Sequence, residues 1–275
     1  MMSTNHLPSH ISQVLTVCRY ELLKFLRGKK ILGILAITIV IAIPVMIMPE
    51  VADTQYPPNI EEFLSLPLSL AFFLIVLSAL FFGGDSLITE FHQRTGYSLF
   101  TNPVSRISIW GGKFLAAELI SFLFIALYYG IISSGAFIIY DQMKFEMFSS
   151  LGISLVVLTM IMSLSFLISS SLRGPTGAAI LIFFLFIVIL PMFDQLLMNV
   201  METKPWFTPS FSATIFENII LVPYPSDLPE GELQRGPFDH DRFVAYVEES
   251  LAIMLIYIIL ASSISIYIFK RKEMV

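Results

Sequence analysis

The sequence predicts an all-α, polytopic membrane protein with six transmembrane helices and an N-terminal amphipathic helix at the membrane interface. Of its 275 residues, 56% are hydrophobic and only 13% are charged, whereas a soluble domain carries about 25% charged residues. The apolar residues come in runs long enough to cross a bilayer, with almost no charge inside them. Lysine and arginine gather in alternate segments between these runs, as they do in multi-pass proteins.

The six spans are located by their uncharged runs. A span needs about 20 apolar residues, because the hydrocarbon core is about 30 Å thick and a helix rises about 1.5 Å per residue. Runs of this kind cover residues 31–49, 63–84, 119–140, 147–172, 174–193 and 250–269. No small-residue cleavage site follows the first run, so we expect an uncleaved span there rather than a signal peptide.

The distribution of basic residues orients the chain. With the N-terminus in the cytoplasm, all 16 lysines and arginines except Lys144, Lys204, Arg235 and Arg242 fall on the inner side. Most of the 21 acidic residues then fall on the outer side. We therefore predict one transmembrane domain over residues 1–275 in the cell membrane, with both termini cytoplasmic and an extracytoplasmic segment over residues 194–249.

Residues 11–27 predict an amphipathic helix directly before the first span. Their apolar residues recur at i, i+3, i+4 and i+7, with polar residues largely on the other face. The apolar positions are Ile11, Val14, Leu15, Cys18, Leu22, Phe25 and Leu26, and the polar positions are Gln13, Arg19, Glu21, Lys24 and Arg27. A basic helix of this kind lies in the inner headgroup layer. The alternative is a cytoplasmic cap on the helix bundle.

Residues 85–113 form the longest connection on the inner side. Residues 86–94 favour a helix that stops near Gly96, and Asn102-Pro103 predicts a turn. Residues 104–110 then run back toward the next span. Two short elements with mixed charges and exposed aromatic residues are typical of a docking surface for a cytoplasmic partner.

A motif runs through this connection. Its residues are Glu90, Gly96, Pro103, Val104, Ser105, Arg106, Gly112 and Lys113. It resembles the segment between the second and third spans of ABC-2-type permeases, the membrane-spanning subunits of certain ABC transporters. Gly96 lies two positions later than in the commonest version of that pattern, so the helix break is displaced. The order of an amphipathic helix, six spans and a long outer segment before the last span is similar too.

The resemblance implies that residues 85–113 are a coupling loop, which rests in a cleft of a cytoplasmic ABC ATPase subunit and transmits its closure. By resemblance, charged side chains contact that subunit or orient the loop, and aromatic side chains anchor it. The charged residues are Glu90, Arg94, Arg106 and Lys113, and the aromatic ones are Phe91, Tyr97 and Phe100. The alternative is solvated charges and aromatics at the membrane interface. The resemblance also implies a second permease subunit, identical or related, and ATP and Mg²⁺ on the ATPase subunits.

Missing motifs narrow the function classes. No stretch fits Gly-x-x-x-x-Gly-Lys-Ser/Thr, so another chain would bind the ATP. Asp85, Glu118, Asp194 and Glu249 are all expected near span ends, which argues against a proton-coupled transporter, an ion pump or an intramembrane metalloprotease. Asp239-His240-Asp241 is a poor metal site, because adjacent residues point in different directions. We expect no catalysis, cofactor or metal in this chain, and no nucleic-acid partner.

Serines within the spans have two interpretations. Ser133, Ser134, Ser163, Ser170 and Ser262 either allow close helix packing or line a mildly polar translocation path. With no charge expected at depth, we expect an exporter of a lipid-like or otherwise hydrophobic cargo, surrounded by membrane lipid. The alternative function is a non-transporting scaffold or assembly subunit of a larger complex. An intramembrane enzyme is disfavoured, because the spans lack a buried polar constellation.

Overall fold

The computed structural model describes residues 9–84, 86–88, 104–172, 174–221, 224 and 243–271, and in these ranges the chain is helical without any β-strand. Six helical segments of the described residues are long and apolar enough to cross a membrane. They are Lys29–Val51, Ile60–Gly83, Arg106–Tyr140, Glu146–Ser171, Pro175–Asn199 and Val247–Arg271. Each coincides with one predicted span, which confirms the all-α, six-span fold.

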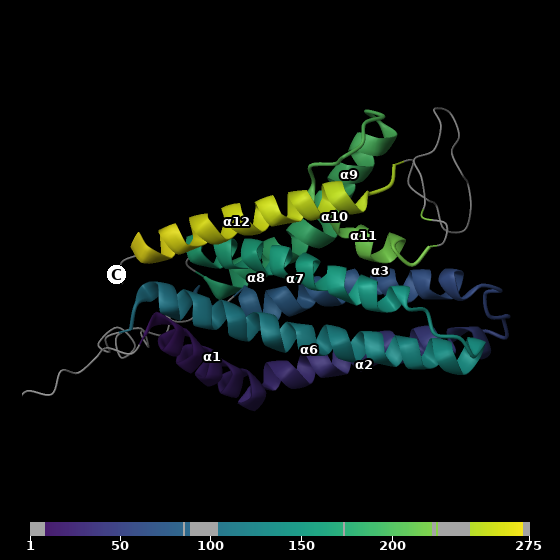
Figure 1. Cartoon of the computed structure of the whole chain (residues 1–275), viewed down its shortest axis with the longest axis horizontal. Coiled ribbons are helices and arrows are strands. Elements are labelled where there is room, and N and C mark those ends of the chain that lie inside the picture. The colour runs from purple at the N-terminus through teal and green to yellow at the C-terminus, as the bar shows by residue number, and fades with distance from the viewer. Residues whose placement is uncertain are drawn as a thin grey trace, which may run out of the picture.

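The N-terminal helices lie along one long helix. Helix α1 (His10–Arg27) and helix α2 (Lys29–Val51) meet at Gly28, whose extended backbone (φ −82°, ψ 149°) lets the chain change direction. Both pack against α6 (Arg106–Tyr140), and Figure 1 shows them following one another along it. The start of α1 and the end of α12 (Val247–Arg271) lie at the same end of the molecule in Figure 1.

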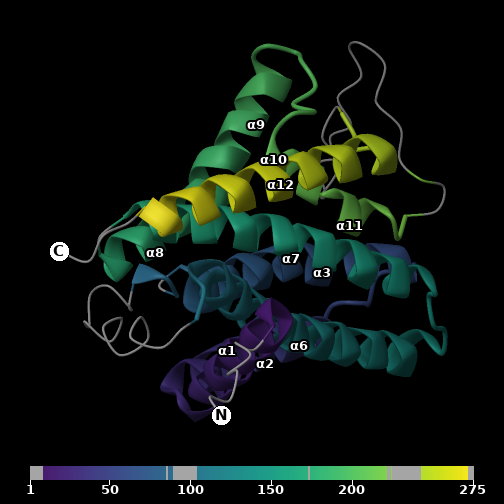
Figure 2. The ribbon, with the colours of Figure 1, turned by 60° about the vertical axis from the view of Figure 1, so that its left-hand side comes forward.

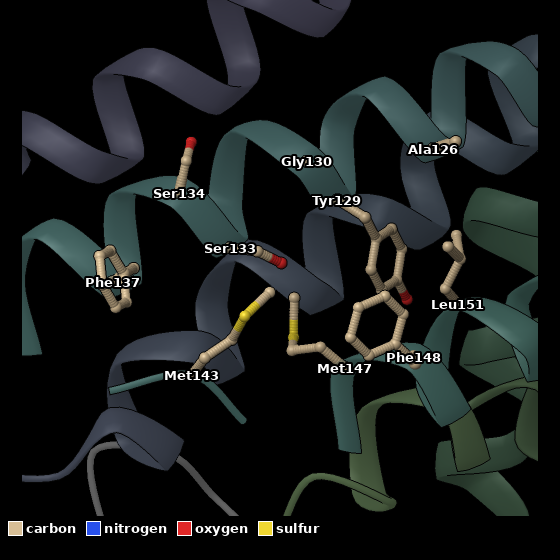
Figure 3. A pocket seen from close by; sticks show the side chains of 10 residues that line it. All are labelled: Ala126, Tyr129, Gly130, Ser133, Ser134, Phe137, Met143, Met147, Phe148 and Leu151. Atoms are coloured by element: carbon tan, nitrogen blue, oxygen red, sulfur yellow. The ribbon is translucent and has the colours of Figure 1, made fainter. Parts of the chain in front are cut away.

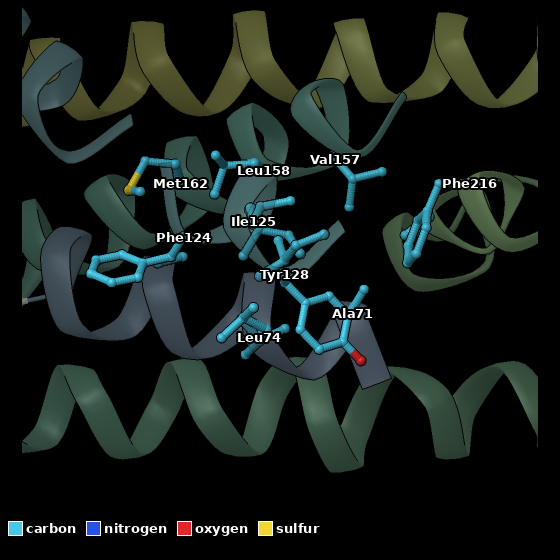
Figure 4. Packing of buried hydrophobic residues seen from close by; sticks show 14 of the residues in the cluster. Ala71, Leu74, Phe124, Ile125, Tyr128, Val157, Leu158, Met162 and Phe216 are labelled. Carbon is cyan, nitrogen blue, oxygen red and sulfur yellow. The ribbon is translucent and has the colours of Figure 1, made fainter. Parts of the chain in front are cut away.

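The core is formed by α3 (Ile60–Ser78), α6 and α7 (Glu146–Ser171). Helix α3 continues as the π-helical segment η1 (Ala79–Gly83). Figure 4 shows side chains of all three helices meeting with Phe216 of the short helix α11 (Ile215–Asn218). The Tyr128 hydroxyl is buried there and donates to the Pro67 carbonyl at 2.7 Å, which satisfies the one polar atom of a large apolar side chain.

The fifth span is interrupted. Helix α8 (Pro175–Phe184) passes through the π-helical segment η2 (Leu185–Ile189) into α9 (Leu190–Asn199). Pro191 has no backbone N–H, so the regular hydrogen-bond ladder fails one turn before it and the helix widens. Figure 2 shows α9 projecting away from α12, which itself lies along α7. Between α9 and α11 lies the short helix α10 (Pro209–Ala213).

Two boundaries differ from the sequence prediction. Helix α6 begins at Arg106, inside the predicted loop 85–113 and well before the predicted span 119–140. Its 35 residues give a length of about 52 Å, longer than a hydrocarbon core of about 30 Å, so one end of α6 extends beyond it. The fifth span ends at Asn199, so the first residues of the predicted outer segment 194–249 are helical.

Candidate functional site at the start of α6

Ser105 starts α6. Its side chain accepts a hydrogen bond from the Ser108 amide at 3.1 Å, which satisfies one of the free N–H groups of the first turn. The Ser105 backbone amide donates to Gln13 Oε1 of α1 at 3.1 Å, and the Ser105 hydroxyl lies 3.4 Å from His10 Nδ1. The first turn of α1 and the first turn of α6 are therefore held together by polar contacts.

A glycine allows α1 to approach α6 closely. A Cβ atom on Gly112 would lie 2.6 Å from Val17 Cβ and 2.8 Å from the Val14 carbonyl oxygen. Only glycine fits at that spacing without moving one of the two helices. Gly111, one position earlier, would place a Cβ 3.6 Å from the nearest Val14 atom, an ordinary contact.

A buried ion pair lies one residue further along α6. The Lys113 ammonium, whose side chain is 1% exposed, pairs with Glu21 Oε1 of α1. Lys24 approaches the other carboxylate oxygen at 3.4 Å, but its side chain is 54% exposed. Removing one partner of a buried pair leaves an uncompensated charge and costs several kcal/mol, about 3–5. The pair therefore fixes the register of α1 on α6.

The first turn of α6 holds the C-terminal end of α12. Arg106 Nη1 donates to the carbonyl oxygens of Lys270 at 3.0 Å and Phe269 at 3.4 Å. A guanidinium at the C-terminal end of a helix interacts favourably with the helix dipole. One turn later, Trp110 Nε1 donates to Ser265 Oγ at 3.0 Å. The start of α6 is thus bonded to both terminal helices of the chain.

The structure buries only part of the predicted apolar face of α1. Cys18 and Phe25 are buried, but Ile11, Leu15 and Leu26 are exposed, Ile11 by 73%. Gln13 and Glu21, expected on the polar face, are buried instead. The reason is that Gln13 bonds to Ser105 and Glu21 bonds to Lys113. The side of α1 that faces α6 therefore includes these polar residues, and part of the apolar face stays exposed. An exposed apolar strip of Ile11, Leu15 and Leu26 remains beside the contact with α6.

Most predicted coupling residues lie outside the described part of the chain. These are Glu90, Phe91, Arg94, Gly96, Tyr97 and Pro103. Arg106 and Lys113 are described, and the structure brings them together with α12 and α1. The polar atoms of these two residues contact other helices of the same chain.

The predicted serines fall into different surroundings. Ser262 Oγ donates to Ser163 Oγ at 3.2 Å, which joins α12 to α7. Ser170 Oγ is buried and donates to the Leu167 carbonyl of its own helix at 2.8 Å. Ser133 and Ser134 instead border a cavity between α6 and α7. Helix packing and cavity lining are therefore both represented among them.

Glu118 lies inside helix α6, whereas the sequence analysis expected it just before a span over residues 119–140. Because α6 begins at Arg106, Glu118 lies within the transmembrane helix and faces α7, where Thr159 Oγ1 donates to its Oε1 at 2.7 Å. Its Oε2 is buried with no hydrogen-bond partner among the described residues. The buried Glu118 carboxylate is therefore a polar group between two helices, which the sequence analysis did not anticipate. The helix-start signal at Ser105 would have revealed the longer helix.

The described residues contain no group of three His, Cys, Asp or Glu side chains that could hold a metal ion. Asp239-His240-Asp241 lies outside those residues.

Comparison with protein families relates the chain to a known group of proteins. A family model described as "ABC-2 family transporter protein" matches residues 15–274, nearly the whole chain. No curated protein matches it.

Proposed function

Because the chain belongs to the ABC-2 family of transporter proteins, we propose that it is a permease subunit driven by ATP hydrolysis on a separate cytoplasmic ABC ATPase subunit. It moves its substrate outward, as an exporter. Two permease subunits, identical or related, pair in the cell membrane and bind two ATPase subunits, which hold ATP and Mg²⁺. The sequence supports this division of labour, because it contains no phosphate-binding loop of its own.

One observation carries the proposal. The segment Ser105–Lys113 directly follows most of the predicted coupling loop, and it is bonded to α1 through Gln13 and Glu21 and to α12 through Lys270. A push on the loop would therefore act on the start of α6 and reach the first and last helices of the chain together. Packed helices joined by specific polar contacts move as one body rather than deform continuously.

The placement of α1 in the inner headgroup layer is part of this proposal. Its exposed apolar strip, Ile11, Leu15 and Leu26, would enter lipid, while Arg19 and Arg27 face the anionic headgroups. Both termini are then cytoplasmic, in agreement with the distribution of lysine and arginine. The coupling loop lies on the same side, where an ATPase subunit can reach it.

The test is co-purification of the tagged chain with ATPase subunits from its own cells, followed by ATP-dependent transport in vesicles. Glu90→Lys reverses one charge of the predicted coupling loop. We expect ATP-dependent transport to be lost while the permease still assembles and inserts. The matched control is Glu248→Lys, which reverses an exposed charge in the first turn of α12 at the opposite end of the molecule.

The alternative, a scaffold or assembly subunit, predicts a different result. Glu90→Lys would then abolish assembly of the larger complex, and no ATP-dependent flux would be measurable even with the unaltered chain. Isolation of the chain without any ATPase subunit would contradict the proposed function.

A further inference from the structure

A cavity of about 450 Å³ opens between α6 and α7, at the end of the molecule away from the chain termini. One continuous stripe of α6 borders it, and α7 with the preceding turn closes the other side. Figure 3 shows its lining residues: Ala126, Tyr129, Gly130, Ser133, Ser134, Phe137, Met143, Met147, Phe148 and Leu151. On α6, small residues alternate with the aromatic residues Tyr129 and Phe137, and methionine, phenylalanine and leucine side chains border the cavity on the other side.

The cavity is apolar in its chemistry. The Tyr129 hydroxyl is bonded to Ser150 Oγ at 2.9 Å, and Ser150 in turn donates to the Phe216 carbonyl at 2.5 Å. Ser134 Oγ donates to the Ile131 carbonyl of its own helix. A water molecule needs two to four polar partners, and the remaining lining hydroxyl, that of Ser133, does not supply them alone. The site therefore suits an apolar ligand better than water or a polar one.

The length of the cavity identifies the ligand. From Ala126 to Phe137 it follows α6 for 11 residues, about 16 Å at 1.5 Å per residue, which matches one leaflet of a hydrocarbon core about 30 Å thick. Lys144, which follows the lining residue Met143, pairs with Glu61. Charged side chains therefore lie next to one end of the apolar lining. Phe137, Met143 and Phe148 at the border are exposed on the surface of the bundle.

We propose that this cavity binds one acyl chain of a phospholipid resident in the leaflet opposite the chain termini. The acyl chain lies along the stripe from Phe137 to Ala126, and its headgroup lies at the level of Lys144. A void of this size between membrane-spanning helices forfeits dispersion contacts, and an acyl chain restores them. Gly130 has open space where its Cβ would lie, so none of the described residues fills this part of the cavity. The proposal requires membrane insertion and holds whichever substrate is transported.

The experiment uses the full chain in phosphatidylcholine nanodiscs that contain a phospholipid with a photoreactive diazirine in the middle of one acyl chain. After illumination, the labelled peptides are identified by mass spectrometry. We expect adducts concentrated in residues 126–137 and 143–151. Gly130→Leu places a side chain in the cavity, and we expect it to lower these adducts about tenfold, the effect of a loss of roughly 1.4 kcal/mol of binding free energy.

The matched control is Gly33→Leu. Gly33 is also an exposed helical glycine with open space at its Cβ position, but it lies on α2, so this change should leave the adducts unaltered. Labelling spread evenly over all lipid-facing helices, or unchanged in Gly130→Leu, would overturn the proposal. So would a second copy of the chain in the cavity, detected as an intermolecular disulfide of Ser133→Cys in a Cys18→Ala background.

Discussion

Glu21 in α1 and Lys113 in α6, 92 positions apart in the sequence, form an ion pair that is buried between the two helices. Replacing Lys113 by Met leaves the Glu21 carboxylate buried without this partner. We expect the free energy of unfolding to fall by about 3–5 kcal/mol. The measurement is equilibrium unfolding of the purified chain in detergent micelles.

Lys24 supplies the control for this pair, because it contacts the same carboxylate from an exposed position. Lys24→Met should cost at most about 1 kcal/mol. The double variant Glu21→Met with Lys113→Met should regain most of the lost stability, since an apolar pair of similar volume replaces the charges. Equal losses of unfolding free energy for Lys24→Met and Lys113→Met would show that the buried pair stabilises the fold no more than the exposed contact does.

Gly112 and Gly111 form a second matched pair. Gly112→Ala should force α1 and α6 apart and lower the free energy of unfolding by about 1–3 kcal/mol, because a Cβ there meets Val17 and the Val14 carbonyl. Gly111→Ala should be neutral or stabilising by up to about 1 kcal/mol, since its Cβ fits and alanine favours a helix. Thermal unfolding in the same detergent distinguishes them, and an order reversed between the two variants would refute this close approach.

Arg106 is expected to hold the last turn of α12. In Arg106→Gln the carbonyls of Phe269 and Lys270 lose a charged donor, which costs about 1–2 kcal/mol. Amide hydrogen exchange should rise in the last turn of α12 and stay unchanged near Val247. Arg271→Gln is the control, because Arg271 lies over the Tyr267 ring at 4.4 Å and makes only an exposed contact. Similar exchange in both variants would argue against a cap by Arg106.

A substitution of Ser262 distinguishes two roles for its hydrogen bond with Ser163, helix packing and a part in the translocation path. Ser262→Ala should lower the free energy of unfolding by only about 0.6 kcal/mol, the usual size of a hydrogen bond between transmembrane helices. Transport in vesicles should stay within twofold of the unaltered protein, because the bond serves to pack α12 on α7. A large loss of transport with unchanged stability would instead place these serines on the substrate path.

Much of the fold could be read from single segments. Apolar runs located all six spans, because hydrocarbon thickness sets a minimum helix length whatever the neighbouring helices are. The sequence analysis missed the start of α6, because the charges of Arg106 and Lys113 suggested a loop outside the membrane. Ser105 is nevertheless a residue type that commonly caps the start of a helix. As a consequence, the sequence analysis did not foresee that Glu118 lies inside α6 and contacts Thr159 of α7. A charge within a helix is compatible with membrane insertion when another helix supplies its partner, and the sequence does not name that partner.

The sequence by itself determined the six spans and the family motif, since these depend on local composition and periodicity. Only the tertiary structure decided which side of α1 is buried. Periodicity defines an apolar face, but the ion pair with Lys113 and the contact at Gly112 turn that face partly toward the surface. The tertiary structure also decided that Ser133 borders a cavity while Ser163 packs against α12. Both outcomes depend on side chains far apart in the chain, whose distances arise only when the helices pack.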